Sequence, residues 1–292
     1  MNIAKDLQGK VFVVTGANSG IGFESALDFA RRGATVVILC RNEARGQSAV
    51  AAIKQESGNQ SVHLYLADFS LLASVAEAGR AVREDFPRID VLCNNAGAAN
   101  EKRQETAEGF ELTFAANHLG GFLLTQLLMP SLLAAAENDH ARIVFTSSLG
   151  HKSGPLDFDD LNMHKGYRGL KAYGRSKLMN LLTARELDQR YRGKGIVTSS
   201  FHPGAVRTPI WSKGGVSGRL LGVVLYPFMV SIKKGADTMI WLASSMDDLS
   251  RHANGHYYFK RQRPSIAPFA TDEAAHRLWD ISLELVQPFL DD

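Results

Sequence analysis

Short apolar runs rich in β-branched residues recur along the chain and alternate with longer stretches that have helical spacing. Runs of this kind predict buried strands. Seven are expected, at 10–15, 34–40, 62–66, 90–93, 141–146, 195–201 and 256–260. The last of the predicted helices spans 271–286, and its apolar residues are expected to pack near a ligand pocket or a partner subunit. These are Leu278, Trp279, Ile281, Leu283 and Leu285.

The first predicted strand runs directly into a glycine-rich segment, 16–22, which a helical pattern follows to Arg32. Glycines in such a turn let the backbone approach a pyrophosphate, and the helix N-terminus offers unpaired N–H groups to its charge. The first two glycines are separated by three residues, unlike the Gly-x-Gly-x-x-Gly fingerprint, so an ordinary tight turn is the alternative. The predicted dinucleotide contacts here are Gly16, Asn18, Ser19, Gly20, Ile21 and Gly22.

Strands and helices alternate without a linker, repeat or low-complexity tract. This pattern predicts an α/β fold, with one doubly wound Rossmann-type parallel sheet of about seven strands and helices on both faces. Right-handed crossovers and the position of the glycine turn favour the strand order 3-2-1-4-5-6-7. We therefore expect residues 1–292 to form a single NAD(P)-binding domain.

The second predicted strand ends at Arg41, where a unit that prefers NAD would carry an acidic residue. The planar guanidinium of Arg41 fits a 2′-phosphate, and Arg45 lies one turn into the next helix. The sequence therefore predicts NADP(H) as cofactor. Two solvated arginines at a helix start are the alternative.

Tyr173 and Lys177 lie one helical turn apart, which places a phenol and an ammonium on one face. The Lys177 cation, together with a nicotinamide cation, is expected to lower the pKa of the phenol from its usual value of about 10. Tyr173 is then a candidate general acid or base for carbonyl/alcohol interconversion. A Tyr-x-x-x-Lys pattern also arises by chance on exposed helices, so the other motifs of the chain must show whether this pair is catalytic.

The sequence resembles the short-chain dehydrogenase/reductase family along nearly the whole chain. The matching residues are Thr15-Gly16-x-x-x-Gly20-Ile21-Gly22, Asp68, Asn94-Asn95-Ala96-Gly97, Asn117, Ser147-Ser148, Tyr173-x-x-x-Lys177, His202-Pro203-Gly204 and Thr208. Segments 147–151, 172–178, 202–207 and 255–282 are most similar to its retinol-dehydrogenase-like branch. The resemblance implies a nicotinamide-dependent oxidoreductase.

Two further positions are expected at the adenosine half of the cofactor. Asp68 would accept a hydrogen bond from the adenine amino group, or instead cap the helix expected at 70–85. Asn95, Ala96 and Gly97 permit close approach to the ribose, and Asn95 can connect neighbouring strands. A purely structural turn is the alternative for this segment.

The resemblance assigns roles around the reacting centre. Asn117 would hold a water that links Lys177 to solvent, whereas a back-bonded or exposed asparagine is the alternative. Ser148 would polarise the substrate carbonyl, although the sequence alone does not exclude Ser147. Lys177 would also hold the nicotinamide ribose, and the loop 151–170 is expected to affect substrate access. The loop after the sixth strand is expected to reach the nicotinamide carboxamide through Pro203, Gly204, Val206 and Thr208.

Residues 189–236 contain eight cationic side chains and no acidic one, and 220–230 is almost wholly apolar. An 11-residue run with an internal proline, Pro227, is too short to span a bilayer, which takes about 20 residues. We expect a lid around 208–234 over an apolar substrate, with peripheral contact to an anionic membrane as a further role. A buried helix in the core or in a homo-oligomer interface is the alternative.

Global properties narrow the function further. The net charge of +3 does not favour nucleic acid as a partner. Cys40 and Cys93 both close apolar runs, which predicts buried free thiols in a reducing compartment. Residues 1–8 lack an apolar signal-peptide core, so a cytoplasmic location is expected. No Cys/His cluster suggests a metal site.

The leading hypothesis is an NADPH-dependent reductase that interconverts a carbonyl and an alcohol on an apolar small molecule. One alternative is reduction of a conjugated double bond, with Tyr173 protonating carbon. The other is an NADP-sensing binding protein without turnover, which has no need for the set Asn117, Ser148, Tyr173 and Lys177.

Overall fold

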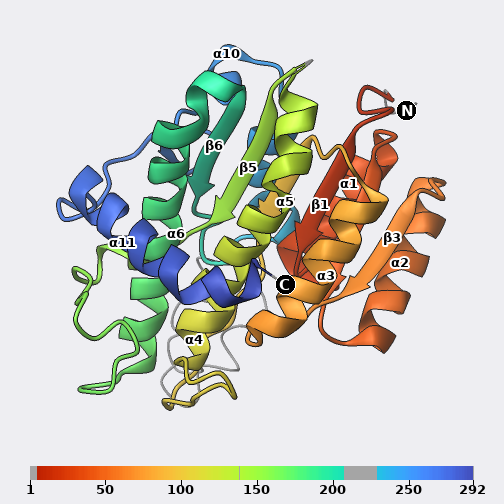
Figure 1. The fold of residues 1–292 in the computed structure, drawn as a ribbon. Coiled ribbons are helices and arrows are strands. Elements are labelled where there is room, and N and C mark those ends of the chain that lie inside the picture. Colours follow the sequence, from red (N-terminus) through yellow and green to blue (C-terminus); the bar gives the residue numbers. More distant parts are fainter. Residues whose placement is uncertain (1–4, 138, 207–228, 292) are drawn as a thin grey trace.

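The computed structural model describes residues 5–137, 139–206 and 229–291. Seven parallel strands form one sheet in the order β3-β2-β1-β4-β5-β6-β7, which confirms the predicted order (Figure 1). The strands are β1 (Val11–Thr15), β2 (Thr35–Cys40), β3 (Val62–Leu66), β4 (Val91–Asn94), β5 (Ala141–Thr146), β6 (Ile196–Phe201) and β7 (Tyr257–Tyr258).

Strand β7 is shorter than the predicted 256–260. The chain turns back directly after it, and Phe259 pairs with Gln262 in an isolated antiparallel bridge. Lys260 and Arg261 have φ values of 51° and 60°, in the left-handed region that ends an extended strand. The apolar run therefore continues into a tight turn.

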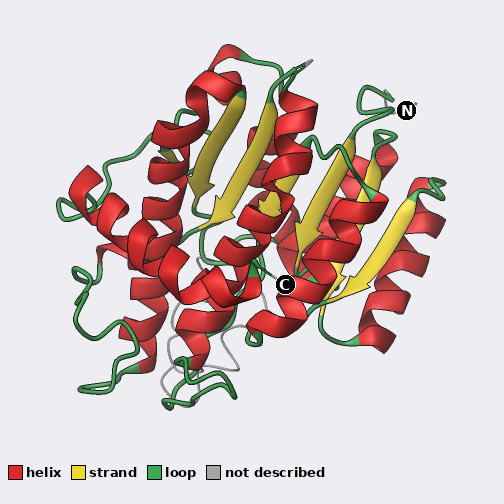
Figure 2. Ribbon diagram, in the orientation of Figure 1, coloured by secondary structure: helices red, strands yellow, loops and turns green. Residues whose placement is uncertain are grey.

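Helices cover both faces of the sheet (Figure 2). One layer contains α1 (Gly20–Arg31), α2 (Glu43–Ser57), α9 (Ile232–Ser244) and α10 (Asp248–Arg251). The other contains α3 (Leu72–Asp85), α4 (Leu112–Phe114), α5 (Gly120–Ala136), α6 (Gly169–Tyr191) and α11 (Asp272–Val286). Alternate side chains of β1 point to opposite faces of the sheet. Val13 packs in the buried cluster on one face, and Phe12 and Val14 pack in the cluster on the other.

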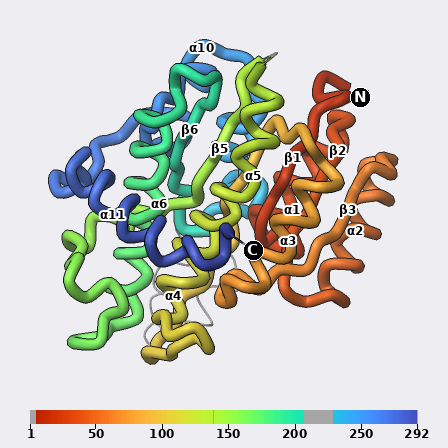
Figure 3. The backbone as a smooth tube through the Cα atoms, in the orientation of Figure 1, coloured from red at the N-terminus to blue at the C-terminus, as the bar shows by residue number. Residues whose placement is uncertain are grey.

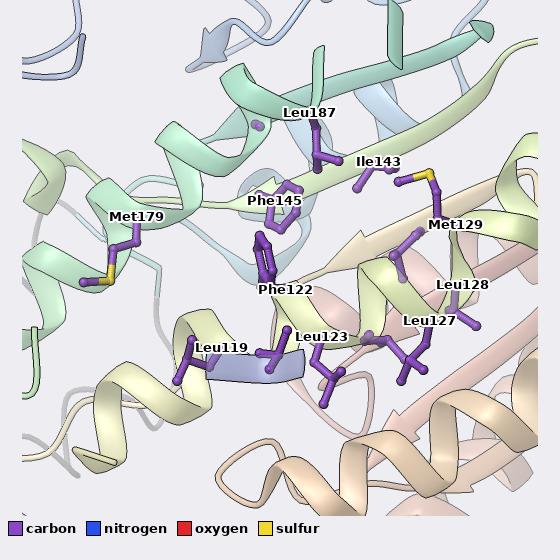
Figure 4. Packing of buried hydrophobic residues seen from close by; sticks show 14 of the residues in the cluster. Leu119, Phe122, Leu123, Leu127, Leu128, Met129, Ile143, Phe145, Met179 and Leu187 are labelled. Atoms are coloured by element: carbon purple, nitrogen blue, oxygen red, sulfur yellow. The ribbon is translucent and has the colours of Figure 1, made fainter. Parts of the chain in front are cut away.

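The apolar stretch from 109 to 136 has helical spacing and predicts one long helix, but in the structure this helix is interrupted. It begins at Leu112, since the Glu111 carboxylate accepts from the first free N–H groups, and a π-helix, η1 (Ala115–Leu119), separates α4 from α5. Among the described residues, the run Leu112–Ala136 alone is long and apolar enough to cross a membrane, but 67% of its most apolar stretch is buried in the protein. Its side chains pack against β5 and α6 in the core (Figure 4).

Helix α11 lies across α6 and α5 and completes one face of the core. Leu278 and Trp279 are buried, and the Trp279 ring meets Phe122 at a centroid distance of 4.9 Å. The apolar side of this helix therefore packs against the core of the chain itself. Its closeness to a ligand or a partner subunit stays a prediction. The two cysteines are buried and free, as expected.

Candidate active site

The order of strand addition reverses between β1 and β4, and the candidate site lies at the carboxyl ends of these two strands. Figure 3 shows the course of the backbone through β1 and α1. The glycine turn after β1 needs glycine for two reasons. Gly16 and Gly20 have φ values of 67° and 62°, which L side chains rarely adopt. A Cβ on Gly22 would lie 2.7 Å from both the Asn95 Nδ2 and the Gly16 carbonyl oxygen. The turn thus packs directly against the loop after β4.

This turn leads into α1 with its first N–H groups free of a side-chain cap. The N-cap residue Ser19 makes no capping hydrogen bond, and no acidic residue lies in the first turn. An anion at this helix end would meet backbone donors and the positive end of the helix dipole. The segment therefore fits the diphosphate of a dinucleotide.

Asn95 connects the ends of three strands. Its Nδ2 donates to the carbonyl oxygen of Thr15 in β1 at 2.9 Å, and its Oδ1 accepts from Thr146 Oγ1 in β5 at 3.4 Å. Thr15 Oγ1 accepts in return from the backbone N–H groups of Asn95 and Ala96, each at 2.9 Å. These bonds hold the loop after β4 close to the glycine turn.

Arg41 and Asp68 lie together at the ends of β2 and β3. The Arg41 side chain is 66% exposed, and its Nη1 lies 3.8 Å from Asp68 Oδ2. Arg45 is exposed in the first turn of α2, where its backbone N–H donates to Asn42 Oδ1. Both arginines are thus exposed at this edge of the sheet, where an anion can reach their guanidinium groups.

The alternative that Asp68 caps the next helix is wrong. Its Oδ1 accepts from the backbone N–H and the hydroxyl of Ser70, and the N-cap of α3 is Leu71. The carboxylate of Glu108 accepts from the first N–H groups of α3 instead, at 2.8 and 2.9 Å. A residue 36 positions along the chain provides the cap, because the fold brings it there.

Tyr173 and Lys177 share one face of α6, as the spacing predicts. Lys177 Nζ lies 5.4 Å from the centroid of the Tyr173 ring and donates to the Thr146 carbonyl oxygen at 3.1 Å. Asn180 Nδ2 donates to the same oxygen at 3.0 Å. Burial lowers the pKa of Lys177 to about 8, because the ammonium loses its hydration. The sequence carried no signal for Thr146, which acts through its backbone.

The expected direction of the Tyr173 pKa is wrong for the protein without nucleotide. Burial raises the pKa of this phenol to about 12, and the hydrogen bond with Ser148 opposes that rise only in part. The loss of hydration on burial destabilises phenolate more than Ser148 stabilises it. Tyr173 is therefore a protonated phenol at neutral pH.

The two serines after β5 have different surroundings. The Ser147 hydroxyl is buried and donates to the Lys177 carbonyl oxygen at 2.6 Å. The Ser148 hydroxyl accepts from the Gly150 N–H at 3.1 Å, and its interaction with the phenol lowers the pKa of Tyr173. Ser147 thus fastens α6 to the sheet, whereas Ser148 lies beside the phenol.

Asn117 is placed by the π-helix η1 and is only 3% exposed. Its Oδ1 accepts from the Ala98 N–H at 2.7 Å, and its Nδ2 donates to the Ala98 carbonyl oxygen and to Ser176 Oγ. The alternatives of a back-bonded or exposed side chain are wrong. A Cβ on Gly97 would lie 3.2 Å from both Asn117 Oδ1 and Lys177 Nζ, so these two polar groups converge on Gly97.

The loop after β6 continues the same edge of the sheet. Gly204 has a φ of 88° and donates from its N–H to His202 Nδ1 at 3.3 Å. Val206 pairs with Val230 in an isolated parallel bridge. Thr208 and most of the predicted lid, 208–228, lie outside the described residues.

Comparisons with known proteins agree with this geometry. Residues 10–215 match the family described as short chain dehydrogenase. The chain is 37% identical to human retinol dehydrogenase 13, over 96% of this chain and 85% of that protein. It is 38% identical to a Streptomyces sp. (strain C5) protein described as a daunorubicin C-13 ketoreductase, over 96% and 93%. A solved structure of an uncharacterised protein from Mycobacterium Paratuberculosis has a TM-score of 0.76 at 28% identity, and the match covers 98% of both chains.

Proposed function

Because the chain belongs to the short-chain dehydrogenase/reductase family, in its retinol-dehydrogenase-like branch, we propose that it is an NADPH-dependent carbonyl reductase acting on an apolar small molecule. The reaction is reversible as an alcohol dehydrogenation. The observation that carries the proposal is the convergence of Ser148, Tyr173 and Lys177 beside the turn that fits a dinucleotide.

Each of these residues has a defined task. Bound NADPH supplies the hydride that reduces the carbonyl carbon. Ser148 Oγ accepts from the Gly150 N–H, and its own proton, which faces Tyr173 in the protein without substrate, can turn to donate to a substrate carbonyl oxygen. Tyr173, protonated at neutral pH, donates the proton that converts that oxygen to a hydroxyl.

Lys177 and Asn117 restore the proton on Tyr173. The pKa of Lys177, about 8, is close to neutral pH, so its ammonium can exchange protons under working conditions. Asn117 Oδ1 and this ammonium both lie next to Gly97, and the bonds of Asn117 to Ala98 hold its side chain there. A water held by Asn117 would link the ammonium to solvent. The same ammonium would hold the nicotinamide ribose of a bound cofactor.

The preference for NADPH rests on the end of β2. Arg41 and Arg45 are exposed there. The Asp68 carboxylate lies 3.8 Å from the Arg41 guanidinium, which is a long distance for an ion pair. A 2′-phosphate can displace this weak surface contact, because an arginine fork binds phosphate through two charge-assisted hydrogen bonds.

The preference for an apolar substrate rests on the rim of the site. Leu149, directly after Ser148, is 59% exposed, and Leu170, one turn before Tyr173, is 53% exposed. Two relatives are named for retinol and for the C-13 ketone of daunorubicin. The apolar run 220–230 would add to this surface as part of a lid. Membrane contact through that lid, self-association and a cytoplasmic location remain predictions.

The test is cofactor oxidation by purified protein on aldehydes and ketones of increasing apolar size, with NADPH and NADH compared side by side. Turnover should rise with apolar size and prefer NADPH. Tyr173→Phe should bind NADPH nearly as well as wild type but lose turnover by about 10²-fold to 10⁴-fold. Retained turnover in this variant would refute the role of Tyr173, and products with a saturated carbon–carbon bond would indicate a double-bond reductase. Tight NADPH binding without turnover would favour a sensor.

A further inference from the structure

A histidine lies buried behind Ser148, outside the set of residues described above. His151 belongs to the 3₁₀ turn η2 (Leu149–Lys152), of which Ser148 is the N-cap, and it is 0% exposed. Its ring packs on Tyr257 of β7 at a centroid distance of 4.6 Å. The ring therefore fills the space between the last strand of the sheet and the segment after β5 that carries Ser147 and Ser148, called here the serine loop.

The hydrogen bonding of this ring has one arrangement. His151 Nδ1 lies 2.7 Å from the Ser148 carbonyl oxygen. A carbonyl oxygen only accepts, so Nδ1 carries the proton and donates it. The His151 backbone N–H donates to the same oxygen at 3.1 Å. Burial lowers the pKa of His151, so the ring is neutral at neutral pH and its Nε2 is left as an acceptor.

That Nε2 is buried and has no hydrogen-bond partner among the described residues. A buried, unpaired polar atom destabilises the folded protein, and a phenyl ring would fill a similar volume without this cost. A histidine at this position is therefore best explained by the bond from Nδ1. That bond fixes the backbone of the serine whose hydroxyl faces Tyr173.

We propose that His151 is a positioning residue that holds Ser148 in the orientation needed to polarise the substrate carbonyl. The Nδ1–H bond anchors the Ser148 carbonyl group, while Gly150 orients the Ser148 hydroxyl from the other side. His151 does not touch the substrate. The inference rests on the proposed function, because it acts through Ser148.

The test replaces His151 with asparagine or glutamine, whose side-chain amides place an N–H donor at different positions of the former ring. Asparagine puts its N–H near the position of Nδ1, whereas glutamine puts it near Nε2, out of line with the Ser148 carbonyl. His151→Asn should therefore keep wild-type turnover. His151→Gln should lower kcat by about tenfold to a hundredfold, the scale of a misplacement of about 1 Å, with NADPH affinity unchanged.

A double-variant cycle separates positioning from a general structural effect. If His151 acts through Ser148, His151→Gln should cost nothing further in a Ser148→Ala background. His118→Gln is the matched control, since it removes another buried imidazole that bonds Ser282 and not the serine loop. Its effect on kcat should be the same with or without Ser148.

Wild-type turnover in His151→Gln, or losses that multiply in the double variant, would overturn the inference. Should His151→Gln not fold, His151→Asn alone decides, because a loss of turnover in that variant also overturns it. A protein that reduces no carbonyl would refute the proposed function separately. In that case a crystal structure of His151→Gln with Ser148 unmoved would still overturn the inference.

Discussion

Replacing Lys177 with methionine should make the protein without nucleotide more stable and at the same time inactive. The pKa of this buried lysine falls from 10.5 to about 8, so at pH 7 the folded chain holds an ammonium that its surroundings disfavour. At about 1.4 kcal/mol for each unit of pKa, this burial costs about 3 kcal/mol. Methionine removes the charge and fills a similar volume.

The substitution also removes one hydrogen bond. The Thr146 carbonyl oxygen keeps its bond from Asn180 Nδ2, so no buried acceptor is left unpaired. We subtract about 1 kcal/mol for the lost bond, which leaves a net gain of about 2 kcal/mol in the free energy of unfolding at pH 7. Turnover should nevertheless fall strongly, because the ammonium beside Tyr173 is gone.

The sign of the pH dependence follows from the two pKa values. The unfolded chain holds the Lys177 proton up to about pH 10.5, whereas the folded chain releases it near pH 8, so the cost in wild type disappears as the pH rises between them. Urea unfolding at pH 7 and pH 9.5 measures this. The advantage of Lys177→Met should shrink by about 2 kcal/mol between the two conditions.

Lys171→Met is the matched control, since Lys171 lies on the exposed side of the same helix. It should change the free energy of unfolding by less than about 0.5 kcal/mol. The reasoning would be refuted if Lys177→Met were no more stable than wild type at pH 7 and the difference between them were the same at pH 9.5.

Three further substitutions test separate parts of the site. Arg41→Asp should shift the ratio of kcat/KM from NADPH towards NADH, measured with both cofactors, and an unchanged ratio would mean that the 2′-phosphate is held elsewhere. Gly22→Ala should lower the unfolding free energy by about 1–3 kcal/mol and weaken nucleotide binding, because its Cβ would meet Asn95 Nδ2 at 2.7 Å; an unchanged Tm would contradict this close approach. Ser147→Ala should lower stability by about 1 kcal/mol and retain most turnover, whereas Ser148→Ala should lose turnover. Kinetic measurements that gave the reverse would exchange the roles of the two serines.

Much of the fold could be predicted from the chain alone, because local patterns determine it. Apolar β-branched runs predicted all seven strands, and right-handed crossovers with a glycine turn after the first strand predicted their order. The distance between Tyr173 and Lys177 was likewise predictable, since four residues make about one turn of helix wherever that helix lies.

Other features depend on which distant segments meet. The π-helix at Asn117 and the cap that Glu108 gives to α3 arise from contacts between residues far apart in sequence, and no local pattern encodes them. The same holds for the choice between Ser147 and Ser148, which depends on what each hydroxyl reaches across the fold.

The sequence by itself therefore determined the architecture and the residue types of the site, whereas the tertiary structure decided their electrostatics. Tyr173 illustrates the difference. Its neighbour at helical spacing suggested a lowered pKa, but burial raises the pKa to about 12. Helical spacing is a property of one element, whereas the hydration of a phenol is set by every segment that packs around it, and only the folded chain brings those segments together.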